Sequence, residues 1–162
     1  MQRQDECALR KIEHHLRDPK RKDEDSLEVR NLAKLNPACV ACGAKGLRLC
    51  FSQGLDGAAA RWRPTSDWES FQGTIHGGII GTVLDEAMSK AIIAREWEAF
   101  TAELRVRFRG RIAPGDQLHV RGWGAERHKR HIRTEATLVT DTGDERANAW
   151  GTFLAPGSSH TI

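Results

Sequence analysis

The sequence lacks the features of a membrane or exported protein. Its 162 residues contain no apolar run that approaches the roughly 20 residues needed to span a bilayer. The first residues, MQRQDECALRKIEHH, are charged and have no apolar centre, so we expect no signal peptide. We therefore expect a cytoplasmic protein without membrane contact.

A strong excess of charge of one sign is also missing. The formal net charge of +3 at pH 7 is too small to indicate nucleic-acid binding, but it suits an anionic ligand. No internal repeat or low-complexity tract is present. An apolar content of 39% and a charged content of 29% are typical of a soluble globular protein. The length predicts one domain with a proper core.

Cysteines are few: Cys7, Cys39, Cys42 and Cys50. In a cytoplasmic protein we expect them to be reduced. Cys39 and Cys42 have the spacing of half a zinc site, with Cys50 as a third ligand, but a second such pair and an obvious fourth ligand are missing. The motif does not lie between a strand and a helix, as a redox role requires. We favour a turn of small buried residues and expect no metal and no cofactor.

The stretch from Phe71 to Arg95 predicts a tight turn followed by one long, mostly apolar helix. Its apolar residues recur at the helical period and form a wide arc, so this helix should be buried on most sides. The arc consists of Ile79, Ile80, Val83, Leu84, Ala87, Met88, Ala91 and Ile92. The opposite strip consists of Gly78, Gly81, Thr82, Asp85 and Ser89. One side of the helix is therefore small and open to close approach, with a carboxylate at its centre.

Two adjacent carboxylates on this helix predict different roles. Glu86 has Lys90 four residues further on, which predicts a structural ion pair. Asp85 has only Gly81 and Ser89 at the equivalent positions, so it has no such partner. We therefore assign chemistry to Asp85 and structure to Glu86.

The start of the helix predicts a site for a polarised carbonyl group. A helix N-terminus exposes backbone N–H groups and a partial positive charge, and glycines let another group approach the backbone. A carbonyl oxygen at Gly77 or Gly78 would be polarised, with Asp85 about two turns away and in reach of a water. His76 precedes the glycines, and no G-x-S-x-G motif or other nucleophile setting lies nearby. We interpret His76 as a supporting residue that fixes the turn by hydrogen bonds.

Six segments read as strands, two before the helix and four after it. They cover residues 47–51, 58–63, 100–109, 117–126, 131–140 and 145–154. Short turns between them imply hairpins and an antiparallel sheet. The pattern predicts an α+β domain in which an antiparallel sheet wraps around the long central helix, because that arrangement buries so apolar a helix best.

The residues before this domain differ in character. Ala8, Ile12 and Leu16 are spaced by four, and Asp25 with Glu28 forms a plausible capping box for a second helix. We therefore predict an N-terminal helical extension over residues 1–38, the main domain over 39–156 and a tail over 157–162. Packing against the domain is favoured over a DNA-binding helix-turn-helix, because no recognition helix stands out.

Taken together, the motifs resemble the hotdog-fold acyl-CoA thioesterases of the PaaI-like and 4-hydroxybenzoyl-CoA thioesterase group. The resemblance covers about Cys39 to Leu154. It rests on C-x-x-C-G from Cys39, on His76-Gly77-Gly78 followed after six residues by Asp85, on T-x-E-L-x-V-x-F from Thr101, and on Ile112-x-Pro114-Gly115-Asp116.

The resemblance implies a single hotdog domain that hydrolyses an acyl-CoA thioester to a free carboxylic acid and CoA. Such a domain leaves a sheet edge and one side of the helix uncovered, and the small-residue strip around Asp85 suits a pocket completed by a second subunit, so we expect a homodimer or homotetramer with active sites at the interface. Asp85 falls at the position of the catalytic carboxylate, as base or nucleophile, and Thr101 at that of a hydroxyl that orients the attacking water. Gly77 is the expected oxyanion donor. A non-catalytic acyl-CoA sensor and a hotdog hydratase remain alternatives, and the acyl chain stays undetermined.

Further residues are candidates for substrate binding beside His76 and Gly78. Ser70 takes a position that the family often fills with Asn or Gln, so its hydrogen bond would reach less far. Trp68 and Phe71 lie in the loop before the helix and either wall a substrate pocket or pack over the helix start.

Arginines alternate along the strand after the helix, opposite Leu104, Val106 and Phe108. The four arginines, which therefore share one face, are Arg105, Arg107, Arg109 and Arg111. Guanidinium groups suit phosphate, so we expect Arg107 and Arg109 either to bind the CoA phosphates or to line a solvated sheet face.

Overall fold

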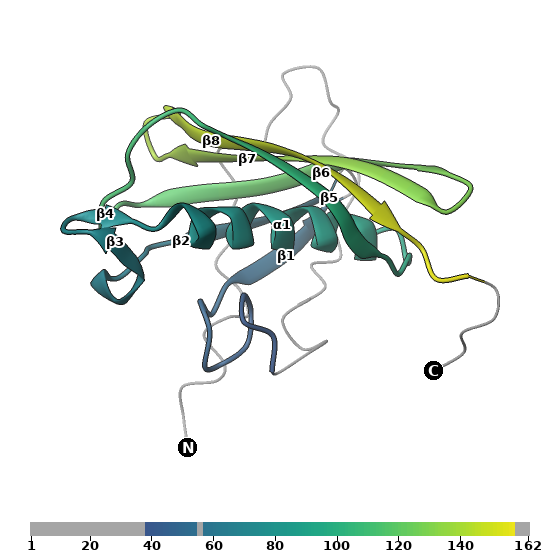
Figure 1. The fold of residues 1–162 in the computed structure, drawn as a ribbon, viewed down its shortest axis with the longest axis horizontal. Helices are drawn as coiled ribbons and strands as arrows, with labels where there is room; N and C mark the ends of the chain where they lie inside the picture. Colours follow the sequence, from purple (N-terminus) through teal and green to yellow (C-terminus); the bar gives the residue numbers. More distant parts are fainter. Residues whose placement is uncertain (1–37, 55–56, 158–162) are drawn as a thin grey trace, which may run out of the picture.

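The computed structural model describes residues 38–54 and 57–157 (Figure 1). Almost all of the predicted N-terminal extension and C-terminal tail therefore lies outside the described residues. Cys7 and residues 55 and 56, which belong to the turn predicted between the first two strands, lie outside them as well. Among the described residues, no helix is long and apolar enough to cross a membrane.

The main elements follow the predicted order of strands and helix. Two strands come first, β1 (Cys50–Gly54) and β2 (Gly57–Trp62). The long helix α1 (Gly77–Ile93) follows. The last four strands are β5 (Phe100–Phe108), β6 (Leu118–His128), β7 (His131–Thr140) and β8 (Glu145–Leu154). A short 3-10 helix (Ser66–Trp68) and a small hairpin of β3 (Glu69–Phe71) and β4 (Thr74–Ile75) lie between β2 and α1.

The strands form a six-stranded antiparallel sheet in the order β1-β2-β6-β7-β8-β5. Figure 1 shows α1 lying along one face of this sheet. The α+β hotdog architecture predicted from the sequence, with one long central helix, is confirmed. Because β5 closes the sheet at one end, it is an edge strand next to the helix.

Two local features differ from the sequence-based expectation. The first strand begins at Cys50 rather than Leu47, because Arg48 has a φ of 58° and this left-handed conformation interrupts an extended run. The segment before the helix contains the β3–β4 hairpin instead of a plain loop. This hairpin is tied to the main body, since the Ile75 N–H donates to the Ile112 carbonyl and the His76 N–H to the Trp68 carbonyl.

The core lies between α1 and the sheet. The apolar arc of the helix is buried: Val83, Leu84, Ala87 and Met88 are all fully inaccessible. Along β8, Ala147, Ala149, Gly151 and Phe153 alternate with more exposed residues, so the strand turns one face to the helix.

Helix and sheet approach most closely at Gly122 of β6. A Cβ built on Gly122 would lie 2.1 Å from the Ala87 carbonyl oxygen and 2.9 Å from the Met88 backbone nitrogen. Both atoms belong to the helix backbone, which cannot yield as a flexible side chain would. The absence of a side chain at Gly122 therefore sets the distance between α1 and the sheet.

We predict that Gly122→Ala lowers the free energy of unfolding by about 1–3 kcal/mol, because the new methyl group forces helix and sheet apart. Chemical denaturation followed by circular dichroism measures the change. Gly54→Ala in β1 is the matched control, since a Cβ there meets nothing within 4 Å. Equal stability losses in the two variants would contradict the close approach at Gly122.

Candidate active site

The small-residue strip of α1 and the apolar face of β5 line a pocket that is open to solvent. Its volume is about 760 Å³. The residues that line it are Val40, Gly77, Gly78, Gly81, Thr82, Asp85, Thr101, Leu104, Val106 and Phe108. Asp85 supplies the only carboxylate among these lining residues. The pocket therefore combines apolar walls with one acidic group, as in most small-molecule sites.

Asp85 is held by a hydroxyl group of the neighbouring strand. The Thr101 Oγ1 donates a hydrogen bond of 2.8 Å to the Asp85 Oδ1. Burial raises the pKa of Asp85 above its usual value; the hydrogen bond from Thr101 acts against this rise, and the charge of Glu86 adds to it. The structure thus brings together two residues that the sequence predicted as catalytic partners.

Glu86 points elsewhere, as predicted. Its Oε1 forms an ion pair of 2.9 Å with the Lys90 Nζ, and both side chains are largely buried. Lys90 is one of the few buried charged or polar side chains in the described part of the chain. Because its charge is compensated by Glu86, the predicted structural ion pair is confirmed.

The helix N-terminus opens into the same pocket. His76 is the N-cap residue, and its Nδ1 accepts a hydrogen bond of 2.9 Å from the Gly78 N–H. The prediction that His76 fixes the turn is confirmed. Within the described residues the Gly77 N–H has no hydrogen-bond acceptor. The Phe108 ring lies 3.3 Å from where a Gly77 Cβ would be. This N–H is therefore available to a bound oxygen.

Not every predicted site residue lines the pocket. Trp68 packs against the core and Phe71 is 81% exposed on the β3–β4 hairpin, so neither forms a wall in one protomer. Ser70 lies on the same hairpin. Arg107 and Arg109 alternate with the lining residues of β5, so they face away from the pocket. Their roles in substrate binding stay predictions.

Four apolar residues that line the pocket were not among the site residues predicted from the sequence. Leu104, Val106 and Phe108 sit opposite the arginines on β5, and their alternation was the available signal. Val40 comes from the turn before β1, which the sequence alone could not bring to the helix. It is 63% exposed.

The cysteines of this turn form a second polar group beside the helix. The Cys39 Sγ donates a hydrogen bond of 3.7 Å to the Glu86 Oε2. Cys42 is buried, and burial raises the pKa of its thiol to about 12, with the Cys39 contact and the Glu86 charge adding to the rise. Cys50 is disulfide-bonded. The expectation of reduced thiols is therefore wrong for Cys50, which offers no thiolate as a third zinc ligand.

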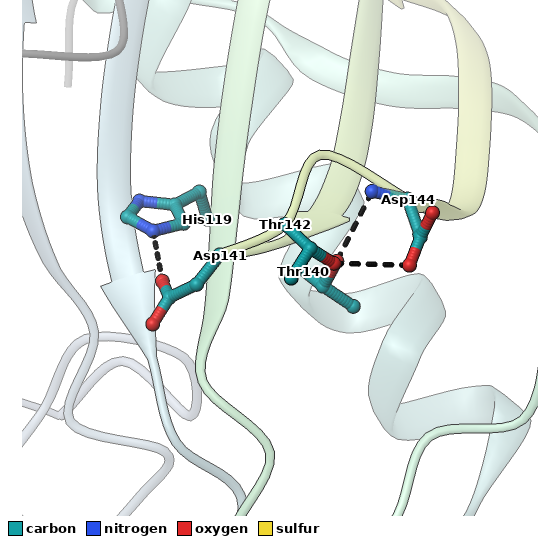
Figure 2. Close-up of polar contacts among 5 residues, drawn as sticks. All are labelled: His119, Thr140, Asp141, Thr142 and Asp144. Carbon is teal, nitrogen blue, oxygen red and sulfur yellow. Dashed lines mark hydrogen bonds and ion pairs between the residues drawn. The ribbon is translucent and has the colours of Figure 1, made fainter.

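A smaller cavity of about 200 Å³ lies apart from this site, beside Arg61, Gln117, Leu118, His119 and Asp141. Figure 2 shows His119 of β6 paired with Asp141 in the β7–β8 turn. In the same turn, the Thr140 Oγ1 accepts from the Asp144 N–H at 3.0 Å, and Thr142 donates to the Asp144 carboxylate at 3.0 Å. The polar groups of these residues are partners of one another, so the conformation of the turn is explained without a bound ligand.

Comparisons with known proteins give one family model that matches part of the chain, and solved structures that share its fold. Residues 72–147 match the family model described as "Thioesterase superfamily". Curated proteins give no match. A hypothetical thioesterase from Streptococcus pneumoniae TIGR4, solved with coenzyme A, is 16% identical over 66% of this chain and 84% of that chain, with a TM-score of 0.62. Two further structures of that protein carry alanine in place of an aspartate or a threonine, at positions 16 apart.

Two other solved structures are similar. The protein smu.793 from Streptococcus mutans UA159, bound to acetyl CoA, is 20% identical over 66% of this chain and 89% of that chain, with a TM-score of 0.62. The E. coli PaaI protein from the phenylacetic acid degradation operon is 20% identical over 70% of this chain and 87% of that chain, with a TM-score of 0.64.

The raised pKa of Asp85 predicts a pH-dependent stability. An ionised Asp85 costs free energy in the folded state. The cost is absent below the usual pKa of about 3.9, grows as the pH rises through the raised folded-state pKa, and is complete above it. Asp85→Asn should therefore unfold at a higher temperature than the wild type at pH 7, and the gap should close below about pH 4. Thermal unfolding across this range, with exposed Glu103→Gln as control, tests it. A gap independent of pH would contradict the argument.

Proposed function

We propose that this hotdog-fold protein of the thioesterase superfamily hydrolyses an acyl-CoA thioester to a free carboxylic acid and CoA. The observation that carries the proposal is the placement of Asp85 in one pocket with Thr101 and the open N-terminus of α1. A base, a group that orients it and a donor for a developing oxyanion are the parts that acyl transfer to water needs.

Asp85 activates the attacking water. Its carboxylate takes a proton from the water, whose oxygen bonds to the thioester carbonyl carbon. The carbonyl electrons move onto its oxygen, which the Gly77 N–H and the positive end of α1 stabilise. The carbon–sulfur bond then breaks, and the CoA thiolate takes up the proton that Asp85 held. Direct attack by Asp85, through a mixed anhydride, uses the same residues.

The environment of Asp85 favours the role of base. A carboxylate with a raised pKa holds a proton more readily near neutral pH than an exposed one. Thr101 fixes the orientation of the Asp85 carboxylate through its 2.8 Å hydrogen bond. Asp85 and Thr101 are 16 positions apart, like the aspartate and threonine replaced in the Streptococcus pneumoniae protein. That similarity supports the pairing of these two residues.

The substrate class rests on the relatives and on the shape of the pocket. Two similar structures were solved with coenzyme A or acetyl CoA. The apolar wall of Leu104, Val106 and Phe108 suits an acyl group next to the reacting carbonyl. His76 supports this reaction over a hydratase, because its Nδ1 is already engaged by the Gly78 N–H at 2.9 Å.

A second copy of the chain completes the pocket. β5 is one of the two edge strands of the sheet, and it exposes Phe100 by 68%, Phe108 by 54% and Leu104 by 37%. Exposed apolar residues along an edge strand are a surface that natural proteins cover. Because Leu104 and Phe108 also line the pocket, the partner would supply its missing wall.

We expect Asp85→Asn to lower the rate of thioester hydrolysis at least ~100-fold, because the general base is lost, while fold and molecular mass stay unchanged. The measurement is release of free thiol from a panel of aryl- and alkyl-CoA esters. Glu103→Gln removes an exposed carboxylate of β5 and should keep full activity. If the wild type binds acyl-CoA but releases no thiol, the protein is a sensor. An active Asp85→Asn variant would exclude Asp85 as base.

Gly77→Pro should lower the turnover by about 100-fold, since one oxyanion donor contributes about 3 kcal/mol. Proline suits the first helical position, and the ψ of 131° at His76 suits a residue before proline, so the helix should still start here. Gly77→Ala is the matched control: it adds a carbon at the same place but keeps the N–H. Equal turnover of the two variants would rule out the Gly77 N–H as donor.

Leu104→Lys should convert the protein to a smaller species, because it places a charge in the proposed subunit contact. Light scattering after size-exclusion chromatography gives the mass. Arg105→Gln, the next residue on the opposite face of β5, should leave the mass unchanged. A wild type that is already monomeric would overturn the proposed association.

A further inference from the structure

Three potential metal ligands meet beside α1, outside the pocket. The Sγ atoms of Cys39 and Cys42 and a carboxylate oxygen of Glu86 all lie within 4.8 Å of one another. The Cys39 Sγ and the Glu86 Oε2 are 3.7 Å apart. Around a tetrahedral zinc ion, bonds of about 2.0–2.3 Å put neighbouring ligand atoms about 3.5–3.8 Å apart. The three groups are thus nearly at the spacing of a bound ion.

From this geometry we propose that Cys39, Cys42 and Glu86 bind a thiophilic divalent metal ion, for which zinc is the best match. Two sulfur ligands at C-x-x-C spacing select zinc over hard cations such as magnesium or calcium. A carboxylate completes three protein ligands, and a water molecule would take the fourth position. The sequence offered Cys39 and Cys42 with Cys50 as a third ligand; in the structure Glu86 takes that place, 47 positions from Cys39 in the chain.

The backbone of the cysteine turn is fixed before any metal binds. The Gly43 N–H donates to the Cys39 carbonyl at 2.7 Å, and the Leu47 N–H donates to the Val40 carbonyl at 2.8 Å. Gly46 permits this turn, because a Cβ there would lie 1.8 Å from the Val40 carbonyl oxygen. Both sulfurs are therefore held towards the helix at little further entropic cost.

The local charges balance when a divalent ion is present. Two thiolates and the Glu86 carboxylate carry three negative charges, and Lys90, 2.9 Å from Glu86, carries one positive charge. A divalent cation brings the sum to zero. This matters because Cys42 and Lys90 are only 8% and 4% exposed, and a net charge at such depth is costly.

A metal ion at this site would hold one wall of the pocket in place. Val40, between the two cysteines, lines the pocket, and Glu86 follows Asp85 on the helix. A metal bound by the three groups would fix the turn against α1. Metal binding by these three groups does not depend on the chemistry of the pocket.

Cobalt(II), a spectroscopic substitute for zinc, tests the proposal directly. The full chain without an affinity tag is reduced, stripped with a chelator, freed of the chelator and titrated with Co²⁺. We expect one ion per chain, with sulfur-to-cobalt charge-transfer absorption and the visible bands of tetrahedral cobalt. Added Zn²⁺ should abolish both signals and raise the unfolding temperature. Absence of the charge-transfer band in the reduced wild type would overturn the proposal.

Variants identify the ligands. Cys42→Ser and Cys39→Ser should lose or weaken the charge-transfer band, and Glu86→Gln should bind Co²⁺ at least ~10-fold more weakly. Cys39 is half-buried, so its variant is informative even if the buried Cys42→Ser fails to fold. Glu103→Gln is the control that should titrate like the wild type. An unchanged band in both cysteine variants, or unchanged affinity in Glu86→Gln, would refute these ligands. A Cys39–Cys42 disulfide in a protein that takes up no metal when reduced would assign the pair to redox chemistry instead.

Discussion

The close approach of α1 to β6 governs the rest of the molecule. Because Gly122 has no side chain, the helix backbone at Ala87 comes into direct contact with the sheet. The rotation of the helix is then fixed along its whole length. Asp85 precedes Ala87 by two residues, or about 200° of helical rotation, so it must point away from the sheet at β6. The position of the proposed catalytic carboxylate thus follows from a packing contact between the helix backbone and β6, outside the pocket.

Two neighbouring carboxylates obtain opposite roles from this rotation. Asp85 reaches the open side of the helix, where burial raises its pKa and Thr101 of β5 supplies a single hydrogen bond. Glu86, turned by about 100°, meets Lys90 and the cysteine turn instead. A poised base needs incomplete compensation of its charge, whereas a structural anion needs a full partner. The surroundings of Asp85 fit its proposed role as a base, and those of Glu86 fit a structural anion.

The two faces of strand β5 differ in the side chains that they carry. Leu104, Val106 and Phe108 face the pocket, and the arginines between them face the other side of the sheet. The period of two along a strand makes this separation complete. As the edge of the sheet, β5 is also where the proposed second subunit joins. The pocket and the proposed subunit contact would therefore share residues, so that association and substrate binding would be linked.

The sequence by itself determined the order of strands and helix, the buried arc of α1, and the ion pair between Glu86 and Lys90. Those properties depend on periodicity and on neighbours three or four residues away, which the chain displays locally. It also predicted Thr101 and His76 as supporting residues, through a family resemblance in the first case and a turn next to the helix in the second. The first strand was predicted to begin at Leu47, but it begins at Cys50, because Arg48 adopts a left-handed conformation that composition does not reveal.

Only the tertiary structure decided which distant groups meet. It put Val40 into the pocket, kept Trp68 and Phe71 out of it, and brought Cys39 and Cys42 to Glu86. It also turned Arg107 away from the pocket, although its neighbours Val106 and Phe108 on β5 line that pocket. Such contacts join segments tens of residues apart, and they depend on the distance and rotation between helix and sheet. No local pattern encodes that geometry, because it arises from the packing of side chains across the core.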